Sequence, residues 1–456
     1  MNTEEIYEAN LEAIAAYLNA GEAEPGDFRL GFELEHFIVS TDTHAHVPYL
    51  GSTDPDGSHV PGIIDVLEAL APFYDRRIVQ DLPEGGETLL GLARSRAVIT
   101  LEPGAQLEVS IGPARNVAEI ERIYTAFRAE LDEVLAPLRY EVVLLGYHPT
   151  ASARAIPLLP KERYRLMDAH FAQTGRHGIC MMRASASTQV SIDFSDEADA
   201  IRKFRIANLI GPLLAFLCDN APKFEDADVR YLTAAESSPA QVADTPLLTT
   251  SGLPVPYRMV RTAIWEDVDP DRSMVCPSVF STGQGYRAYA ATIMERPAIL
   301  TMEPDAVGHG FAAIREIYAN RLMTQDDIEH LLSMFFFDVR FKRYLEIRVA
   351  DALNPALAFA FAALVEGLFY EPRNLDVLDR ALAHVVAGDV HVAKHDLAVA
   401  GYAAKVYGRN ASSWLDELIA LADTDANPDR AYLEPLRALV EARRTPLDAF
   451  CAEDRR

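Results

Sequence analysis

The chain has few cysteines and no excess of basic residues. Its four cysteines are far apart and form no C-x-x-C pair, which disfavours a zinc framework and a disulfide scaffold. The 68 acidic residues outnumber the 42 basic ones, giving a formal net charge of −26. Nucleic acids and anionic membranes bind basic surfaces, so neither is expected as the main partner. We expect small-molecule substrates, and the oligomeric state stays open.

Long apolar runs are also missing. No run approaches the roughly 20 residues that span a bilayer. Residues 1–5, Met-Asn-Thr-Glu-Glu, lack the basic start and apolar stretch of a signal peptide. We therefore expect a cytosolic (cytoplasmic) protein whose cysteines are reduced thiols.

What the sequence does contain is three short segments with polar side chains two residues apart, at 31–36, 101–110 and 344–351. Side chains of a strand alternate between its faces. Each segment would therefore place its charged residues on one face and its apolar residues on the other. Glu33 shares a face with Glu35, and Glu346 shares a face with Arg348. If the chain stays extended through Pro103 and Gly104, Glu102, Gln106 and Glu108 also share a face.

Like charges two apart on one face repel unless something positive lies between them. A divalent cation with bound phosphate would supply that charge, so the pattern indicates a Mg²⁺–nucleotide site on an antiparallel sheet. The alternative is the ordinary polar–apolar alternation of a half-solvated strand. Two local groups of basic residues, 340–348 and 258–272, favour an anionic substrate in this acidic chain.

Strands and helices alternate irregularly along the chain, which favours an α+β fold over a doubly wound sheet. We predict strands near 29–40, 89–100, 101–111, 141–147 and 187–194, helices near 4–19, 63–74, 117–138, 161–173 and 195–218, and a loop at 233–256. From residue 355 onward the chain is rich in alanine with helical periodicity and no convincing strand. The predicted division is a catalytic domain, 1–353, and a helical region packed on it, 354–456.

Six segments carry more specific motifs. They are GFELEHF at 31–37, LEPGAQLEVS at 101–110, IPLLPKERY at 156–164, MM…TQVSIDFSDEADAIRKFR at 181–205, RTAIWEDVDPDR at 261–272 and FDVRFKRYLEIRVAD at 337–351. In this order they resemble the signatures of the plant-type glutamate–cysteine ligases, which belong to the glutamine-synthetase-like superfamily. Together the segments cover roughly residues 29–351.

The resemblance implies a curved antiparallel sheet with flanking helices, whose concave face binds metals, ATP and glutamate. It also implies an ATP- and Mg²⁺-dependent ligase that forms γ-glutamylcysteine through γ-glutamyl phosphate, the first step of glutathione-type thiol biosynthesis. Mg²⁺ takes carboxylate and phosphate oxygens, and phosphoryl transfer needs cations to neutralise developing charge.

The roles carried over from the resemblance are as follows: Glu33, Glu35, Glu102, Glu108 and Glu346 as metal ligands, Gln106 and Gln189 near the metals or nucleotide, Arg348, Arg340 and Lys342 as catalytic cations, and Arg261 with Trp265 as substrate-binding residues. Arg340 and Lys342 share the face of Glu346, so their alternative role is to neutralise neighbouring carboxylates.

Two departures from the family pattern concern the acceptor. The family has arginine two residues after its Met-Met pair, whereas Arg183 follows Met182 directly and Ala184 takes the later place. On a strand, a shift of one residue reverses the face, so Arg183 is not carried over. The family's asparagine after Gln-Val is Ser191 here. A γ-glutamyl ligase with another amine acceptor therefore stays open, as does a non-catalytic metal- or nucleotide-binding protein.

Overall fold

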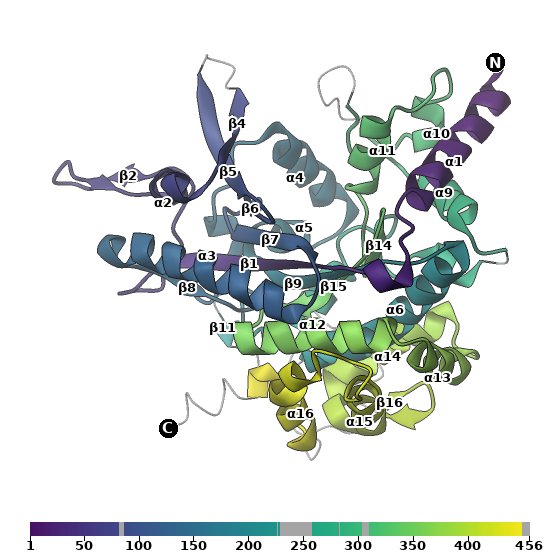
Figure 1. The fold of residues 1–456 in the computed structure, drawn as a ribbon. Helices are drawn as coiled ribbons and strands as arrows, with labels where there is room; N and C mark the ends of the chain where they lie inside the picture. Colours follow the sequence, from purple (N-terminus) through teal and green to yellow (C-terminus); the bar gives the residue numbers. More distant parts are fainter. Residues whose placement is uncertain (82–85, 226, 229–257, 282, 303–309, 449–456) are drawn as a thin grey trace.

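The computed structural model describes residues 1–81, 86–225, 227–228, 258–281, 283–302 and 310–448 (Figure 1). The predicted loop at 233–256 and Cys451 lie outside these residues. The α-helices are α1 (Thr3–Asn19), α2 (Ile63–Leu70), α3 (Val117–Leu138), α4 (Glu162–Thr174), α5 (Gly178–Ala184), α6 (Glu197–Leu217), α8 (Val260–Trp265), α9 (Tyr286–Met294), α10 (Ile314–Ile317), α11 (Gln325–Leu332), α12 (Pro355–Phe369), α13 (Pro372–Leu382), α14 (Ala387–Ala400), α15 (Ala411–Ala422) and α16 (Glu434–Glu441).

The centre of the molecule is an antiparallel sheet of nine strands. Its order is β14 (Val339–Phe341), β15 (Leu345–Asp351), β9 (Ser187–Ile192), β1 (Leu30–Ser40), β7 (Leu107–Ala114), β6 (Ala97–Leu101), β5 (Glu87–Arg94) and β4 (Arg76–Asp81), with β8 (Tyr140–Val143) paired to the far end of β1. Short two-stranded pairs lie outside it: β2 (Ser52–Thr53) with β3 (His59–Val60), β10 (Lys223–Phe224) with β11 (Ala227–Asp228), β12 (Ser273–Met274) with β13 (Phe336–Phe337), and β16 (Lys405–Val406) with β17 (Arg409–Asn410).

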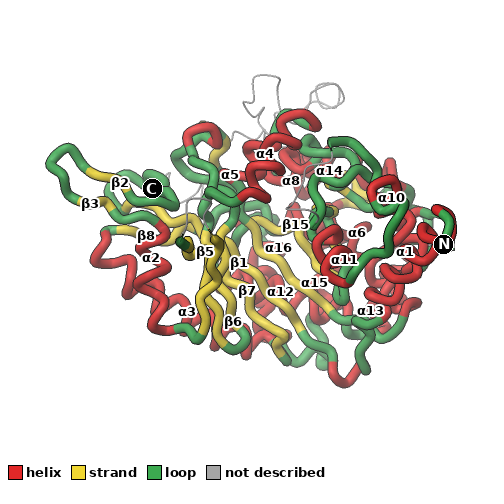
Figure 2. The backbone as a smooth tube through the Cα atoms, turned by 90° about the horizontal axis from the view of Figure 1, so that it is seen from above, coloured by secondary structure: helices red, strands yellow, loops and turns green. Residues whose placement is uncertain are grey.

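The strand register brings distant polar residues together on one face of the sheet. Glu33 of β1 lies opposite Gln189 of β9, and Glu35 lies opposite Glu108 of β7. Figure 2 shows β1, β7 and β15 in one sheet, in which β7 is paired to β1 and β15 is separated from β1 by β9. The antiparallel order thus joins three motifs that are spread over more than 300 residues of the chain.

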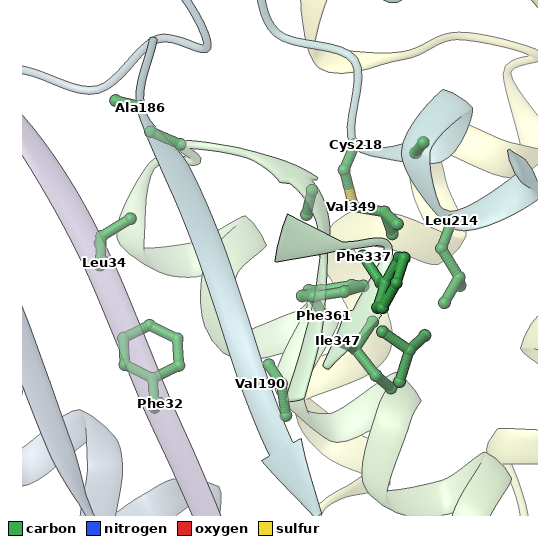
Figure 3. Close-up of a cluster of buried hydrophobic side chains, with 14 of the residues drawn as sticks. Phe32, Leu34, Ala186, Val190, Leu214, Cys218, Phe337, Ile347, Val349 and Phe361 are labelled. Atoms are coloured by element: carbon green, nitrogen blue, oxygen red, sulfur yellow. The ribbon is translucent and has the colours of Figure 1, made fainter. Parts of the chain in front are cut away.

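The other face of the sheet is apolar, as the alternation predicts. Phe32, Leu34 and Val190 are completely buried. Figure 3 shows them in a cluster with Phe361 of α12 and Leu214 of α6. Burial of such side chains contributes about 1.5–3 kcal/mol each, so this face fixes which side chains point the other way.

Helices α3, α6 and α12 cover the apolar face, and α13–α16 lie beyond α12 and α6 (Figure 1). α12 begins where Asn354 accepts a hydrogen bond from the Leu357 amide at 3.1 Å, with Pro355 at the first helical position, both common at helix starts. Most of α12 is buried because it packs on β1 and β9 and also on α15 and α16. The boundary at 353/354 stays a prediction, although the two parts share one hydrophobic core.

Most predicted elements are present within a few residues, but four differ. The predicted strand at 89–100 is two antiparallel strands, β5 and β6, joined by a turn at Ser95 and Arg96. The segment 101–110 is not one strand, since it turns between β6 and β7. Arg183 lies on helix α5, where a strand was expected. The C-terminal region contains the short hairpin β16–β17. In the described residues no helix is long and apolar enough to cross a membrane.

Candidate active site

A cavity of about 290 Å³ lies between the polar face of the sheet and the side chains of α4, α5 and α8. All the site residues predicted from the sequence line it, except Glu346. The lining residues are Glu33, Glu35, Glu102, Gln106, Glu108, Gln189, Arg261, Trp265, Arg340, Lys342 and Arg348, together with Pro103, Lys161, Arg163, Tyr164, Met167, Met181, Met182, Ser185, Ser333 and Phe336.

Glu102 reaches the cavity from a tight turn between β6 and β7. The Glu102 amide donates to the Gln106 carbonyl at 2.9 Å, and Ala105 has a positive φ of 63°. A Cβ atom on Gly104 would lie 2.2 Å from the Arg183 carbonyl oxygen, so this position requires glycine. The turn holds Gln106 with its side-chain amide donating to the Ser185 carbonyl at 2.8 Å.

Two of the acids have fixed hydrogen-bond donors. Glu35 accepts from the Ser187 amide at 2.8 Å, from the Ser187 hydroxyl at 2.7 Å and from the Gln189 side-chain amide at 3.2 Å. Glu108 accepts from the Thr100 hydroxyl of the adjacent strand at 2.7 Å. These donors orient both carboxylates at the floor of the cavity.

The acids of this half of the site have too little positive charge around them. Burial and the charges of Glu108 and Glu346 raise the pKa of Glu33 to about 8. Burial and Glu35 raise the pKa of Glu102 to about 7, and burial and Glu102 raise that of Glu108 to about 8. A cation bound among these carboxylates would relieve this repulsion.

The other half of the site carries the positive charge. Arg340 Nε lies 2.6 Å and Arg348 Nη1 lies 2.8 Å from Glu346 Oε2, and Lys342 Nζ lies 3.8 Å from Glu346 Oε1. Burial opposes ionisation of Glu346, but these three cations hold its pKa below the ordinary value. Arg348 also donates to the Gln189 side chain.

Glu346 is therefore placed differently from the other predicted metal ligands. Its side chain is completely buried and lies behind the cavity wall, beneath the three cations. Both roles considered for Arg340 and Lys342 have support, because they neutralise Glu346 and also line the cavity. Three cations against one carboxylate leave a net positive surface, which suits a phosphate chain.

Arg261 and Trp265 form a side wall on α8. Arg261 Nη1 donates to the Arg348 carbonyl at 3.1 Å, and its guanidinium carbon lies 5.9 Å from the centre of the Trp265 ring. Among the described residues, Arg261 Nε and Trp265 Nε1 are buried without an acceptor. Buried donors are normally satisfied, so this wall fits a ligand that carries a carboxylate.

The acidic half fits a hard divalent cation by donor type, since Mg²⁺ is bound by carboxylate oxygens and phosphates. Within the described ranges no three His, Cys, Asp or Glu side chains are grouped closely enough to hold a metal ion as they stand. The hydrogen-bond donors on Glu35 and Glu108 agree with carboxylates that are held apart. A metal would have to draw them together, with nucleotide phosphates completing its shell.

Sequence reasoning missed the residues that face the sheet from α4 and α5. Lys161, Arg163 and Tyr164 belong to the IPLLPKERY motif, and Met181 and Met182 directly precede Arg183. The motif itself was the signal that could have identified Lys161 and Arg163.

Arg183 turns away from the cavity. It donates to both carboxylate oxygens of Asp168 and to the Ile156 carbonyl, and it does not line the site. This agrees with leaving it out of the predicted ligand contacts, although the cause is a helix where a shifted strand was expected.

Residues 29–452 match the family model described as glutamate–cysteine ligase family 2. The chain belongs to this family. The match extends well beyond the motifs, because it includes the C-terminal helices that the sequence motifs did not cover.

Curated relatives include the chloroplastic glutamate–cysteine ligase of Arabidopsis thaliana, 27% identical over 378 residues, which are 80% of this chain and 64% of that protein. Another is the chloroplastic glutamate–cysteine ligase B of Oryza sativa subsp. japonica, 28% identical over 376 residues, 80% of this chain and 67% of that protein. The chain thus spans about two thirds of the length of these relatives. Their descriptions as chloroplastic contradict the cytosolic location expected from the sequence, and that expectation is wrong.

Among solved structures, the chain is similar to glutamate–cysteine ligase from Francisella tularensis in complex with AMP. The TM-score is 0.50 at 12% identity, over 94% of this chain and 85% of that one. At this identity the likeness concerns the fold alone. It confirms the predicted α+β, glutamine-synthetase-like fold, a large antiparallel sheet with flanking helices.

Proposed function

We propose that this protein is an ATP-dependent ligase that joins the γ-carboxyl group of glutamate to the amine of cysteine, forming γ-glutamylcysteine for glutathione-type thiol biosynthesis. The observation that carries the proposal is the division of one cavity into an acidic and a cationic half. These two halves suit a metal-bound nucleoside triphosphate next to a carboxylate substrate. Family membership and the descriptions of the relatives support the choice of substrates.

In the first step a γ-carboxylate oxygen attacks the γ-phosphorus of ATP, a P–O bond forms, and ADP leaves. In the second step the acceptor amine attacks the acyl carbon, a C–N bond forms, and phosphate leaves as the amine loses a proton. Arg348, Arg340 and Lys342 would offset the charge on the transferring phosphoryl group. This charge develops in the transition state, where fixed cations are most effective.

Glu33, Glu35, Glu102 and Glu108 would hold Mg²⁺. Glu346 would instead fix the positions of Arg340, Lys342 and Arg348, with which it forms ion pairs. Bound Mg²⁺ would supply Lewis-acid neutralisation of phosphate oxygens. Gln189 would place its amide between the two halves, because it contacts both Glu35 and Arg348. Gln106 would keep the β6–β7 turn, and with it Glu102, at the cavity wall.

Arg261 would bind a substrate carboxylate, since guanidinium and carboxylate form paired hydrogen bonds. Met167, Met181 and Trp265 line the same cavity. Their polarizable, apolar surface suits a small thiol-bearing side chain. This is the structural argument for cysteine as the acceptor.

A second candidate is a γ-glutamyl ligase with another amine acceptor. It is favoured by Arg183, which pairs with Asp168 and so is not placed to hold the carboxylate of an amino-acid acceptor. The test is ADP formation from ATP and glutamate with and without cysteine and a panel of amines. Strong stimulation by cysteine supports the first candidate, and stimulation by another amine alone replaces it with the second. ADP release that needs no glutamate would refute both.

A further inference from the structure

Lys394 of the C-terminal helical region is buried next to the substrate wall of the site. Its Nζ lies 2.5 Å from Glu266 Oε1 and 2.7 Å from Asp338 Oδ2, and only 4% of its side chain is exposed. The two carboxylates are nearly as buried. Charges buried in this way are stable only when they are paired, so the three side chains act as a unit.

This unit closes a ring of contacts around the substrate wall. Glu266 is the C-cap of α8, the helix that carries Arg261 and Trp265. Arg261 donates to the Arg348 carbonyl at 3.1 Å, and the Arg348 amide donates to the Asp338 carbonyl at 3.0 Å.

A small cavity of about 20 Å³ lies beside this ring. Its lining includes Lys394 together with Arg261, Trp265, Asp338 and Arg348. Lys394 therefore lies directly behind residues that line the large cavity, not in a remote part of the C-terminal region.

The helix α8 needs such support. It has six residues, far fewer than the dozen or more that an isolated helix requires. Its N-cap, Met259, provides no side-chain hydrogen bond. Glu266 places a negative charge at the C-terminal end, where carbonyl groups already disfavour one, and Lys394 offsets it.

We propose that Lys394 is a positioning residue that fixes α8 against Asp338, and so sets Arg261 and Trp265 relative to Arg348. The C-terminal helical region would thereby determine the affinity of the site for the substrate carboxylate. This inference rests on the proposed function, in which Arg261 and Trp265 bind that carboxylate. The competing explanation is that the ion pairs only stabilise the fold.

The test compares three variants of the full chain. K394M removes the Lys394 partner of Asp338 and leaves Glu266 with the exposed His391, whose Nδ1 lies 2.8 Å from Glu266 Oε2. K394M/E266Q/D338N removes all three charges and is expected to keep a melting temperature near that of the wild type. K203M is the matched control, because Lys203 is equally buried and pairs with Asp199 at 2.8 Å on α6, outside the residues that line the site.

Two readouts are needed. The first is the KM for glutamate and for ATP in steady-state ADP formation. The second needs no substrate: Trp265 and Trp414 are the two tryptophans of the chain, so in a W414F background acrylamide quenching of fluorescence reports the exposure of Trp265 alone.

We expect the triple variant to raise the KM for glutamate by about 10-fold or more, since small displacements of positioning groups are costly, with a smaller change for ATP and faster quenching of Trp265. K203M should lose thermal stability while its KM for glutamate stays within about two-fold of wild type. A triple variant with wild-type KM and wild-type quenching would overturn the inference. Absence of glutamate-dependent ADP formation in the wild type would instead refute the proposed function, and quenching would still decide the role of Lys394.

Discussion

Replacing Arg348 with alanine separates a catalytic role from a structural one. Its side chain supplies one of three cations around Glu346, and Arg340 at 2.6 Å and Lys342 at 3.8 Å remain after the substitution. The backbone contacts of Arg348 with Asp338 and Arg261 also remain. Removing the sole partner of a buried charge costs about 3–5 kcal/mol. With two partners left, we expect a loss of only about 1–2 kcal/mol.

The effect on turnover should be larger than the effect on stability. A preorganised charge that acts in the transition state is typically associated with a factor of about 10²–10³ in rate. R348A should therefore lower kcat by about that factor while the KM for ATP changes less. R348K should recover only part of the rate, because lysine lacks the planar fork of arginine.

The assay is steady-state ADP formation together with a melting curve on the same preparation. A variant that melts several degrees lower, yet keeps kcat within a few-fold of wild type, would refute the reasoning. Arg348 would then serve only as a structural partner of Glu346.

Three further predictions concern the acidic ligands, the buried Glu366 and the cysteines. E33Q and E102Q should each lower turnover by at least about 100-fold with an unchanged or higher melting temperature in EDTA, since one charge of a repelling set is removed; a near-normal rate at ordinary Mg²⁺ would show that the carboxylate is not a ligand. Burial and Asp429 raise the pKa of Glu366 to about 8, so the folded state binds more protons than the unfolded state between about pH 4.5 and 8, and stability falls as the pH rises through this window. E366Q should therefore be more stable than wild type by up to about 5 kcal/mol at pH 9, since each unit of pKa shift is about 1.4 kcal/mol, and similar to it near pH 4, and parallel melting-temperature profiles would contradict this. The described cysteines are free thiols, so dithiothreitol should not change specific activity, whereas a several-fold gain that a Cys-to-Ser variant abolishes would show a regulatory disulfide.

The parts of the site that the sequence could predict are those governed by strand alternation. Phe32 and Leu34 of β1 are buried in the core, which places Glu33 and Glu35 on the opposite face. The same alternation places Gln189 on the polar face of β9. These positions depend on local periodicity and on one buried face, and both can be read from the sequence.

The parts that could not be predicted depend on tertiary contacts. Glu346 shares a face with Arg348, but its cross-strand partner Arg340 draws its carboxylate beneath the cations, and pairing of β14 with β15 is not visible in the periodicity. The turn at Ala105 uses a positive φ without glycine at that position. The support of α8 by Lys394 joins residues more than 120 positions apart.

The central claim is that the γ-carboxylate of glutamate is phosphorylated by ATP before the amine attacks its acyl carbon. Glutamate labelled with ¹⁸O in its γ-carboxyl group tests it directly, with cysteine as the acceptor and mass spectrometry of the released phosphate and of the product. We expect one ¹⁸O atom in each phosphate, and a γ-glutamylcysteine that retains the other ¹⁸O atom in its amide carbonyl and is heavier than the unlabelled dipeptide by that one isotope substitution. Phosphate without ¹⁸O, or phosphate release without formation of an amide, would contradict it.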